Sequence, residues 1–380
     1  MSGAPRTRYL DGLRGLAALQ VILHHTYLTV YPLDQGVHPT GLTKLATSSM
    51  MLSGLGVTVF IVLSGYALSM SAHRRGWALA DGPGPFLRRR ARRLLPAYYV
   101  VLAVSIVLGL TVLSEETGAH WDISVPFTGL DVLGHALVAQ DVIGHPYAIN
   151  HPLWSIALTF HLYLLFPVLL ACAVRWGIGR VAVWALAVTT PIAVAAFLNT
   201  GALLLLRQLH FVGVFAAGMA TLAIVRAQGV VTMNGRERRP PWLALAIALF
   251  VVWAAAPLNH LNHVPFALAV CCLLVGLGTG RLTMLRRLLE WRALVWMGAV
   301  SLSLYLVHAP IVHGTWLTVL RPAGHGVGDI RTLLLLLPLA VGASLLGGWI
   351  FHRCVERPLA PAGAFARRAP GSAPAPGRLG

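Results

Sequence analysis

Long apolar stretches alternate with short polar segments along almost the whole chain, and the arginines are concentrated in some of the polar segments. A helix that crosses a bilayer needs about 20 mostly apolar residues, and ten stretches approach that length. We therefore expect an all-α, polytopic membrane protein with ten transmembrane helices. The expected spans are 13–30, 52–70, 94–113, 153–174, 181–198, 209–225, 242–257, 264–280, 294–312 and 333–351.

The positions of the basic residues indicate how these spans are oriented, because cytoplasmic loops of membrane proteins carry an excess of Lys and Arg. With ten spans, most arginines fall on one side, at 6–8, 74–93, 175–180, 226–239, 281–292 and after 353. The opposite side carries few basic residues and several acids: Lys44, Arg207, Arg321, Arg331, Glu115, Glu116, Asp122, Asp131 and Asp141. Both termini are thus predicted to be cytoplasmic.

Two segments fall outside the spans. The longest non-cytoplasmic loop, 114–152, is expected to form a partly folded cap. Residues 360–380 are rich in Pro, Ala, Gly and Arg, a composition typical of a disordered tail. We therefore expect one transmembrane domain over residues 1–359, followed by a cytoplasmic tail.

The composition excludes other classes of protein. Hydrophobic residues make up 57% of the chain and charged residues 11%, with a mean hydropathy of +0.73. A soluble domain has about a quarter charged residues, and a disordered chain is less apolar. The net charge of +17 lies in clusters between apolar runs, which indicates membrane topology rather than nucleic-acid binding. The four cysteines lack metal or redox spacing, so we expect no disulfide framework.

The first span carries ionisable residues, which are costly inside a membrane and are functional candidates for that reason. Arg14 and His25 lie eleven residues apart, which places them within about 20° on one helical face with a rise of about 16 Å. His24 points about 100° away, and Asp11 is expected to be the N-cap. In the alternative interpretation, Arg14 reaches lipid head groups and the histidines form hydrogen bonds within the bundle.

A basic segment leads into the third span. Arg90 and Arg93 are three residues apart and share a helical face, where two guanidinium groups can bind phosphate through forked hydrogen bonds. The alternative is charge that orients the chain and contacts anionic lipid. We assign that second role to Arg88, Arg89 and Arg92.

Further polar residues recur at helical spacing in the second, fourth and ninth spans. Those expected to support a site are Ser64, Tyr66, Trp154, His161, Ser301, Tyr305 and His308. The last three form a stripe at i, i+4 and i+7. The structural alternatives are close helix packing at Ser64 and Gly65, an interhelical hydrogen bond from Ser301 and a surface position for His308.

The polar residues together favour catalysis. Histidine is the usual general base near neutral pH, and arginines suit a phosphorylated donor such as coenzyme A. The sequence has no Gly-rich phosphate loop, HExxH motif or paired-Cys motif, nor a GxSxG elbow. We therefore expect no metal site and no permanently bound cofactor.

Several short motifs occur in a characteristic order. They are 10–18 followed by His25, 59–66, the Arg90/Arg93/Pro96/Tyr98 pattern, 152–155, 301–308 and 356–358. With these motifs in this order, the chain resembles the membrane acyltransferase 3 family over nearly its whole length. The resemblance implies ten transmembrane helices with cytoplasmic termini, in agreement with the spans above.

The resemblance also implies a reaction, in which an acyl group, often acetyl, passes from cytoplasmic acyl-CoA to a hydroxyl of a sugar, glycan or glycosylated natural product. The essential Arg and His of the family map onto Arg14 and His25, and its arginine motif maps onto Arg90 and Arg93. We expect His25 to act as general base or as a covalent acyl carrier. One departure is Thr159, which stands where relatives often carry an acid.

Two other functions stay open at this stage. A secondary transporter would also have ten spans and intramembrane polar groups, although no acid lies in the middle of a span here. A catalytically degenerate relative is the second, because Thr159 replaces the acid. The expected partners are acyl-CoA, a sugar-containing acceptor and lipids, without nucleic acid, and the expected location is the bacterial plasma membrane.

Overall fold

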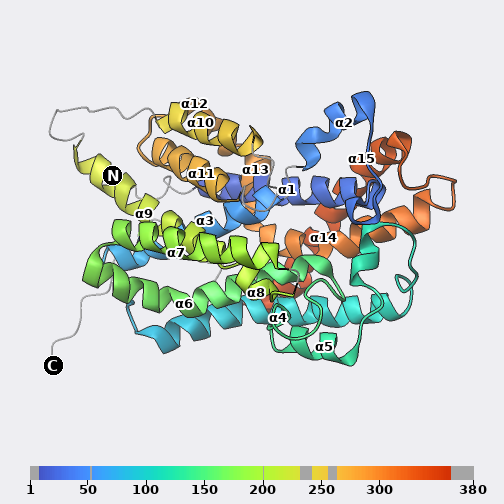
Figure 1. Ribbon diagram of the computed structural model, residues 1–380, viewed down its shortest axis with the longest axis horizontal. Coiled ribbons are helices and arrows are strands. Elements are labelled where there is room, and N and C mark those ends of the chain that lie inside the picture. The colour runs from blue at the N-terminus through green and yellow to red at the C-terminus, as the bar shows by residue number, and fades with distance from the viewer. Residues whose placement is uncertain (1–7, 52–53, 200, 232–241, 256–262, 361–380) are drawn as a thin grey trace.

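The computed structural model describes residues 8–51, 54–199, 201–231, 242–255 and 263–360, and this part is helical, without strands. The all-α prediction is therefore confirmed. The longer helices are α1 (Arg8–Val30), α3 (Gly54–His73), α4 (Pro83–Leu110), α6 (Trp154–Trp176), α7 (Ile178–Leu198), α9 (His210–Val231), α10 (Trp242–Ala255), α11 (His263–Gly278), α14 (Ser301–Thr315) and α15 (Ile330–Phe351). They run roughly along one axis (Figure 1).

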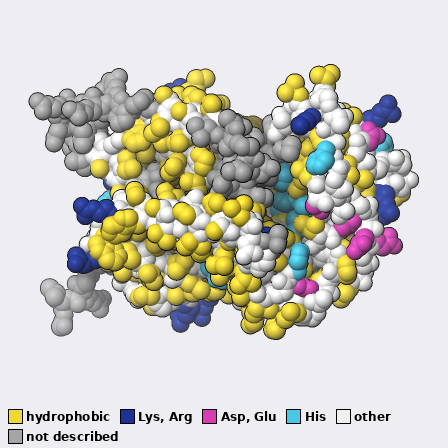
Figure 2. All heavy atoms as spheres, viewed as in Figure 1, with side chains coloured by type: hydrophobic (Ala, Val, Ile, Leu, Met, Phe, Trp, Pro, Cys, Tyr) yellow, Lys and Arg dark blue, Asp and Glu magenta, His cyan; other side chains and the backbone are white. Residues whose placement is uncertain are grey.

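The helices are those of a multi-pass membrane protein. Six in the described part are long and apolar enough to cross a membrane, or eight if each of two bent helix pairs forms one span. The ten crossings and the cytoplasmic termini remain predictions. Apolar side chains cover much of the face shown in Figure 2. On α7, for example, Val183 and Val188 are about 60% exposed, at 63% and 59%, as expected for a lipid-facing helix.

Each expected span coincides with a helix, except that the ninth falls on two. The prediction of one continuous helix over 294–312 is wrong, because α13 (Arg292–Ala299) and α14 are bent by 80°. The reason is a close contact between α13 and α1. A Cβ atom on Gly298 would lie 1.8 Å from the Asp11 carbonyl oxygen, so the two backbones touch where small residues allow it.

The start of α1 also differs from expectation. Asp11 is not the N-cap, because the helix already includes Arg8 and Asp11 lies in its first turn. Its Oδ1 accepts a hydrogen bond from Arg14 Nη1 at 2.8 Å. Pairing with Arg14 and contact with α13 thus take the place of capping.

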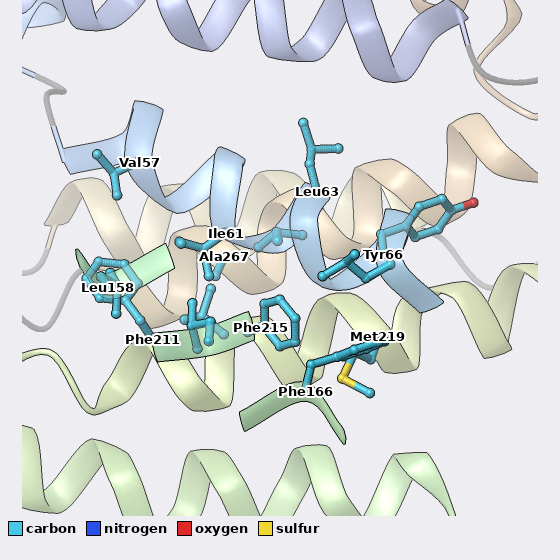
Figure 3. Packing of buried hydrophobic residues seen from close by; sticks show 14 of the residues in the cluster. Val57, Ile61, Leu63, Tyr66, Leu158, Phe166, Phe211, Phe215, Met219 and Ala267 are labelled. Atoms are coloured by element: carbon cyan, nitrogen blue, oxygen red, sulfur yellow. The ribbon is translucent and has the colours of Figure 1, made fainter. Parts of the chain in front are cut away.

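The core around α3 forms a rigid scaffold. Figure 3 shows Ile61 of α3 close to Phe211 and Phe215 of α9, with Phe166 of α6 beneath them. The rings of Phe166 and Phe215 meet edge to face, with centroids 6.0 Å apart. Aromatic pairs of this kind add about 0.5–1.5 kcal/mol beyond their buried area. This packing fixes the helices that wall the site.

The cap predicted at 114–152 is partly folded. It contains η3 (His120–Ser124), α5 (Gly129–Ala136) and, next to α6, η4 (His151–Leu153). Thr128 and Asp131 form a capping box at the start of α5, and the Ile149 amide donates to the Ser124 carbonyl at 2.8 Å. The cap lies at one end of the bundle (Figure 1), and the acidic side chains visible in Figure 2 lie on that half. α4 connects this cap end to the opposite end, where Arg88 to Arg93 lie.

Of the predicted tail, only Ala360 lies within the described residues.

Candidate active site

A cavity of about 590 Å³ lies among the helices. Its walls come from α1, α3, α4, α6, α13 and α14, with Glu356 of η7 (His352–Glu356). Small-molecule sites commonly have volumes of about 300–1,000 Å³, so the cavity can hold part of a substrate. The motif of the first span contributes two residues to the wall, Asp11 and Arg14.

Three predicted arginines meet at this cavity: Arg14, Arg90 and Arg93. Arg14 is paired with Asp11, and the Arg90 guanidinium stacks 5.5 Å from the Phe86 ring centroid and 5.9 Å from that of Tyr163. Within the described ranges, no carboxylate forms an ion pair with Arg90 or Arg93. Their charge is therefore available to an anionic ligand, which guanidinium groups bind bidentately.

One acid in the cavity wall, Glu356, is already engaged. Glu356 is 3% exposed, and its Oε2 accepts from Ser303 Oγ at 2.5 Å and from His352 Nδ1 at 2.8 Å. Those bonds hold Glu356 in the wall, so it does not neutralise the arginine pair. By contrast, Arg89 pairs with Asp81 at 2.9 Å outside the cavity, as expected for a residue with a topological role.

A polar layer forms part of the cavity wall. It consists of Ser64, Thr159, Ser301 and Tyr305. The Tyr305 hydroxyl accepts a hydrogen bond from Ser155 Oγ at 2.6 Å and donates to the Pro152 carbonyl at 3.0 Å. Tyr305 is thus fixed between α6 and α14.

His25 lies beyond this layer and is held by His308. The His308 Nδ1 is 2.7 Å from the Tyr305 carbonyl oxygen, and its Nε2 is 3.0 Å from His25 Nδ1. A carbonyl can only accept, so His308 carries its proton on Nδ1 and its bare Nε2 accepts from His25 Nδ1–H. The Nε2 of a neutral His25 is therefore the nitrogen with a free lone pair.

His308 is completely buried, at 0% exposure, so the surface position considered for it is wrong. The adjacent His24 behaves differently from His25, because its Nδ1 bonds the Met50 carbonyl at 2.9 Å on another side of α1. This matches the different directions expected for the two histidines. Arg14 and His25 both face the interior, one at the cavity and one at the histidine cluster.

Besides His308, three residues expected to support the site do not line the cavity. Tyr66 is buried beside Tyr9, with which it shares a hydrogen bond. The Trp154 ring packs against Phe211, with centroids 6.3 Å apart. His161 faces the buried carboxylate of Asp141, with Nδ1 and Oδ2 3.1 Å apart. These three side chains serve packing and cap attachment instead.

The sequence did not identify two histidines that the fold places next to His25. The His151 ring centroid lies 4.9 Å from that of His25 and 4.8 Å from that of His120. His151 adjoins the motif at 152–155, which was the only local signal. His120 lies in the cap without any pattern around it, so only tertiary structure brings it here.

Comparisons with known proteins show the family to which the chain belongs. The model of the acyltransferase 3 family, described as an acyltransferase domain, matches residues 7–353. The chain is 29% identical to the acyltransferase MdmB of Streptomyces mycarofaciens, over 92% of this chain and 90% of that protein. It is 23% identical to the peptidoglycan O-acetyltransferase OatA of Listeria monocytogenes, over 80% of this chain and 49% of OatA. No solved structure shows a significant match. The chain therefore belongs to the acyltransferase 3 family.

Proposed function

We propose that this protein is an integral-membrane O-acyltransferase of the bacterial plasma membrane. It moves an acyl group, with acetyl as the expected group, from cytoplasmic acyl-CoA to a hydroxyl of a sugar-containing acceptor. The observation that carries the proposal is a chain of contacts from the arginines to His25. Tyr305 lines the same cavity as Arg14, Arg90 and Arg93, its carbonyl oxygen bonds His308, and His308 bonds His25.

The arginine end receives the donor. Coenzyme A carries several phosphate oxygens, and Arg90 and Arg93 present two guanidinium groups without carboxylate partners. Arg14 lines the cavity from α1 and contacts the pantetheine arm or the thioester. The apolar lining of α3, including Val57, Phe60 and Ile61, surrounds the uncharged arm.

His25 activates the acceptor. Its Nε2 lone pair takes the proton of the acceptor hydroxyl while the oxygen attacks the thioester carbon. The C–S bond then breaks, and the thiolate leaves as CoA–SH after taking the proton. Positioned proton transfer contributes about 10²–10⁴-fold to the rate. A covalent route uses the same lone pair, because Nε2 attacks the thioester, releases CoA and passes the acyl group to the hydroxyl.

The acceptor enters from the cap. The cap supplies His120 and Trp121 beside the histidine cluster, and aromatic rings pack well against the apolar faces of sugars. OatA is named for O-acetylation of peptidoglycan, which supports a glycan or another sugar-containing acceptor. Thr159 lines the cavity and bonds only the Ser155 carbonyl of its own helix, at 2.8 Å, so Arg90 and Arg93 face no additional acid there.

The test uses purified protein in liposomes with [¹⁴C]acetyl-CoA and a panel of glycan fragments. We expect CoA release that depends on acceptor, and a large rise in the KM for acetyl-CoA in Arg93→Ala. Arg92→Ala is the matched control, since Arg92 neighbours Arg93 but does not line the cavity. Acetyl-CoA that neither binds nor turns over in the folded protein would overturn the proposal. Equal KM values in the two variants would overturn the donor site.

A further inference from the structure

Three histidines from separate parts of the chain converge beneath the cap. They are His25 of α1, His120 of η3 and His151 of η4. One ring nitrogen of each lies within 4.8 Å of the other two. His25 and His120 are partly exposed, whereas His151 is 6% exposed, so the cluster is anchored in the interior and open on one side. Figure 2 shows histidine side chains exposed on the cap half of the molecule.

Each of these rings already uses its Nδ1 atom. The His25 Nδ1 bonds His308 and the Val21 carbonyl, each at 3.0 Å. The His120 Nδ1 lies 2.9 Å from Asp34 Oδ1. The His151 Nδ1 lies 3.1 Å from Ser124 Oγ. In every case Nε2 is the nitrogen that remains for a ligand.

The partners also determine which nitrogen carries the proton. The Asp34 carboxylate lies 2.9 Å from His120 Nδ1, and an ionised carboxylate can only accept a hydrogen bond. Asp34 is therefore the acceptor for His120 Nδ1–H. Ser124 donates its own proton to the Tyr147 carbonyl at 3.1 Å, so it accepts from His151 Nδ1–H. The Nε2 of all three neutral histidines is a bare lone pair.

Three lone pairs gathered in one place are stable when a cation or a hydrogen-bond donor lies among them. The His151 Nε2 illustrates the problem, because it is buried without any hydrogen-bond partner. We propose that His25, His120 and His151 bind one divalent transition-metal ion of the zinc type through their Nε2 atoms.

The surroundings fit such an ion. Imidazole nitrogens suit Zn²⁺ and its neighbours in the first transition row. Metal-binding histidines almost always donate their other N–H to a carboxylate, a carbonyl or a similar acceptor. Here the acceptors are Asp34 for His120, the Val21 carbonyl for His25 and Ser124 for His151. Tetrahedral bonds of about 2.0–2.1 Å separate ligand nitrogens by about 3.4 Å, so shifts of about 1 Å per ring close the site around the ion.

The metal site rests on the same lone pair of His25 as the proposed function. This Nε2 has one lone pair, so it cannot bind a metal ion and take the proton of the acceptor hydroxyl at the same time. Zinc is therefore expected to inhibit acyl transfer reversibly, so that the histidine cluster acts as an inhibitory metal site.

The experiment measures Co²⁺ binding to the purified, chelator-treated full-length protein by visible absorption and by metal analysis. We expect one Co²⁺ per chain with the intense bands of tetrahedral coordination, which Zn²⁺ bleaches. His120→Ala should lose the bands, and Asp34→Asn should weaken binding about 10–100-fold. His145→Ala is the matched control, because His145 also belongs to the cap but packs edge to face against Tyr147 and is not a member of the cluster.

A second readout separates this proposal from the function it rests on. If the protein is active, zinc should inhibit acyl transfer by wild type and by His145→Ala, and a chelator should restore their activity. The activity that His120→Ala retains should not be inhibited by zinc. No Co²⁺ bands, or bands that survive in His120→Ala, would overturn the metal site whatever the activity. Loss of acyl transfer on removal of metal by a chelator would overturn the inhibitory role of the ion. An inactive protein that binds Co²⁺ as predicted would overturn the proposed function and leave the metal site standing.

Discussion

Gly298 offers a direct test of how the fold shapes the cavity. A Cβ atom at this position would lie 1.8 Å from the Asp11 carbonyl oxygen, whereas ordinary contacts begin at 3.4 Å. Gly298→Ala must therefore move α13 away from α1 by about 1.6 Å, the difference between these two distances. Both sides of the contact are helix backbone, so no flexible side chain can absorb the shift.

The expected cost follows from this geometry. Overpacking of a tight contact destabilises a protein by about 1–3 kcal/mol. Asp11, Arg14, Gly298 and Ala299 all line the cavity, so the same shift displaces Arg14. A misplacement of about 1 Å can cost about 10²-fold in rate, and we expect both stability and transfer to fall.

The assay combines thermal unfolding in detergent with acetyl transfer from labelled acetyl-CoA. Gly314→Ala is the matched control, because it lies in α14, the helix that follows α13, but a Cβ there meets nothing within 4 Å. That variant should gain about 0.5–1 kcal/mol from the better helix former. If Gly298→Ala unfolds at the wild-type temperature and transfers at the wild-type rate, the close contact between α1 and α13 is refuted.

Three further predictions concern the walls and the cap. Tyr305→Phe removes one of two donors to the Pro152 carbonyl, the other being Ser155 Oγ at 3.3 Å, and should cost about 0.5–1.5 kcal/mol, seen as a lower Tm; an unchanged Tm would contradict that role. His161→Leu leaves the buried Asp141 carboxylate without its partner and should cost about 3–5 kcal/mol; the Asp141→Asn/His161→Leu double variant should recover stability, and no recovery would show that the pair is not coupled. Burial raises the pKa of Asp131, but hydrogen bonds from Thr128 and the His145 amide lower it by more, so the net pKa is below its ordinary value. Its stabilisation of the cap is therefore present above the ordinary carboxyl pKa of about 3.9 and is lost as the pH falls through the lowered value. Hydrogen exchange in α5 should show this loss in wild type and not in Asp131→Asn, and identical pH profiles would contradict it.

Much of the helical framework follows from the sequence because lipid-facing and buried helices both need long apolar runs. The runs at 94–113 and 333–351 correspond to α4 and α15 for this reason. The break between α13 and α14 has no such signal. It arises from a contact with Asp11, almost three hundred residues earlier in the chain, and hydropathy within the span does not report it.

The candidate site divides in the same way. Helical periodicity placed Arg90 with Arg93, and Tyr305 with His308, because each pair lies on one helix. The partners of His25 come from three distant segments, and no spacing rule connects His120 or His151 to α1. Conversely, Trp154 and His161 share a face of α6 as expected, but that face packs against α9 and the cap rather than the cavity.

The central claim is that the free lone pair of His25 drives acyl transfer. The most direct measurement compares the turnover of [¹⁴C]acetyl-CoA by His25→Ala and His24→Ala in the same liposomes, at matched amounts of folded protein. The two histidines are adjacent, but His25 bonds His308, whereas the His24 Nδ1 bonds the Met50 carbonyl. We predict a loss of about 10²–10⁴-fold for His25→Ala and near wild-type turnover for His24→Ala. Equal turnover by both variants and wild type would contradict the claim.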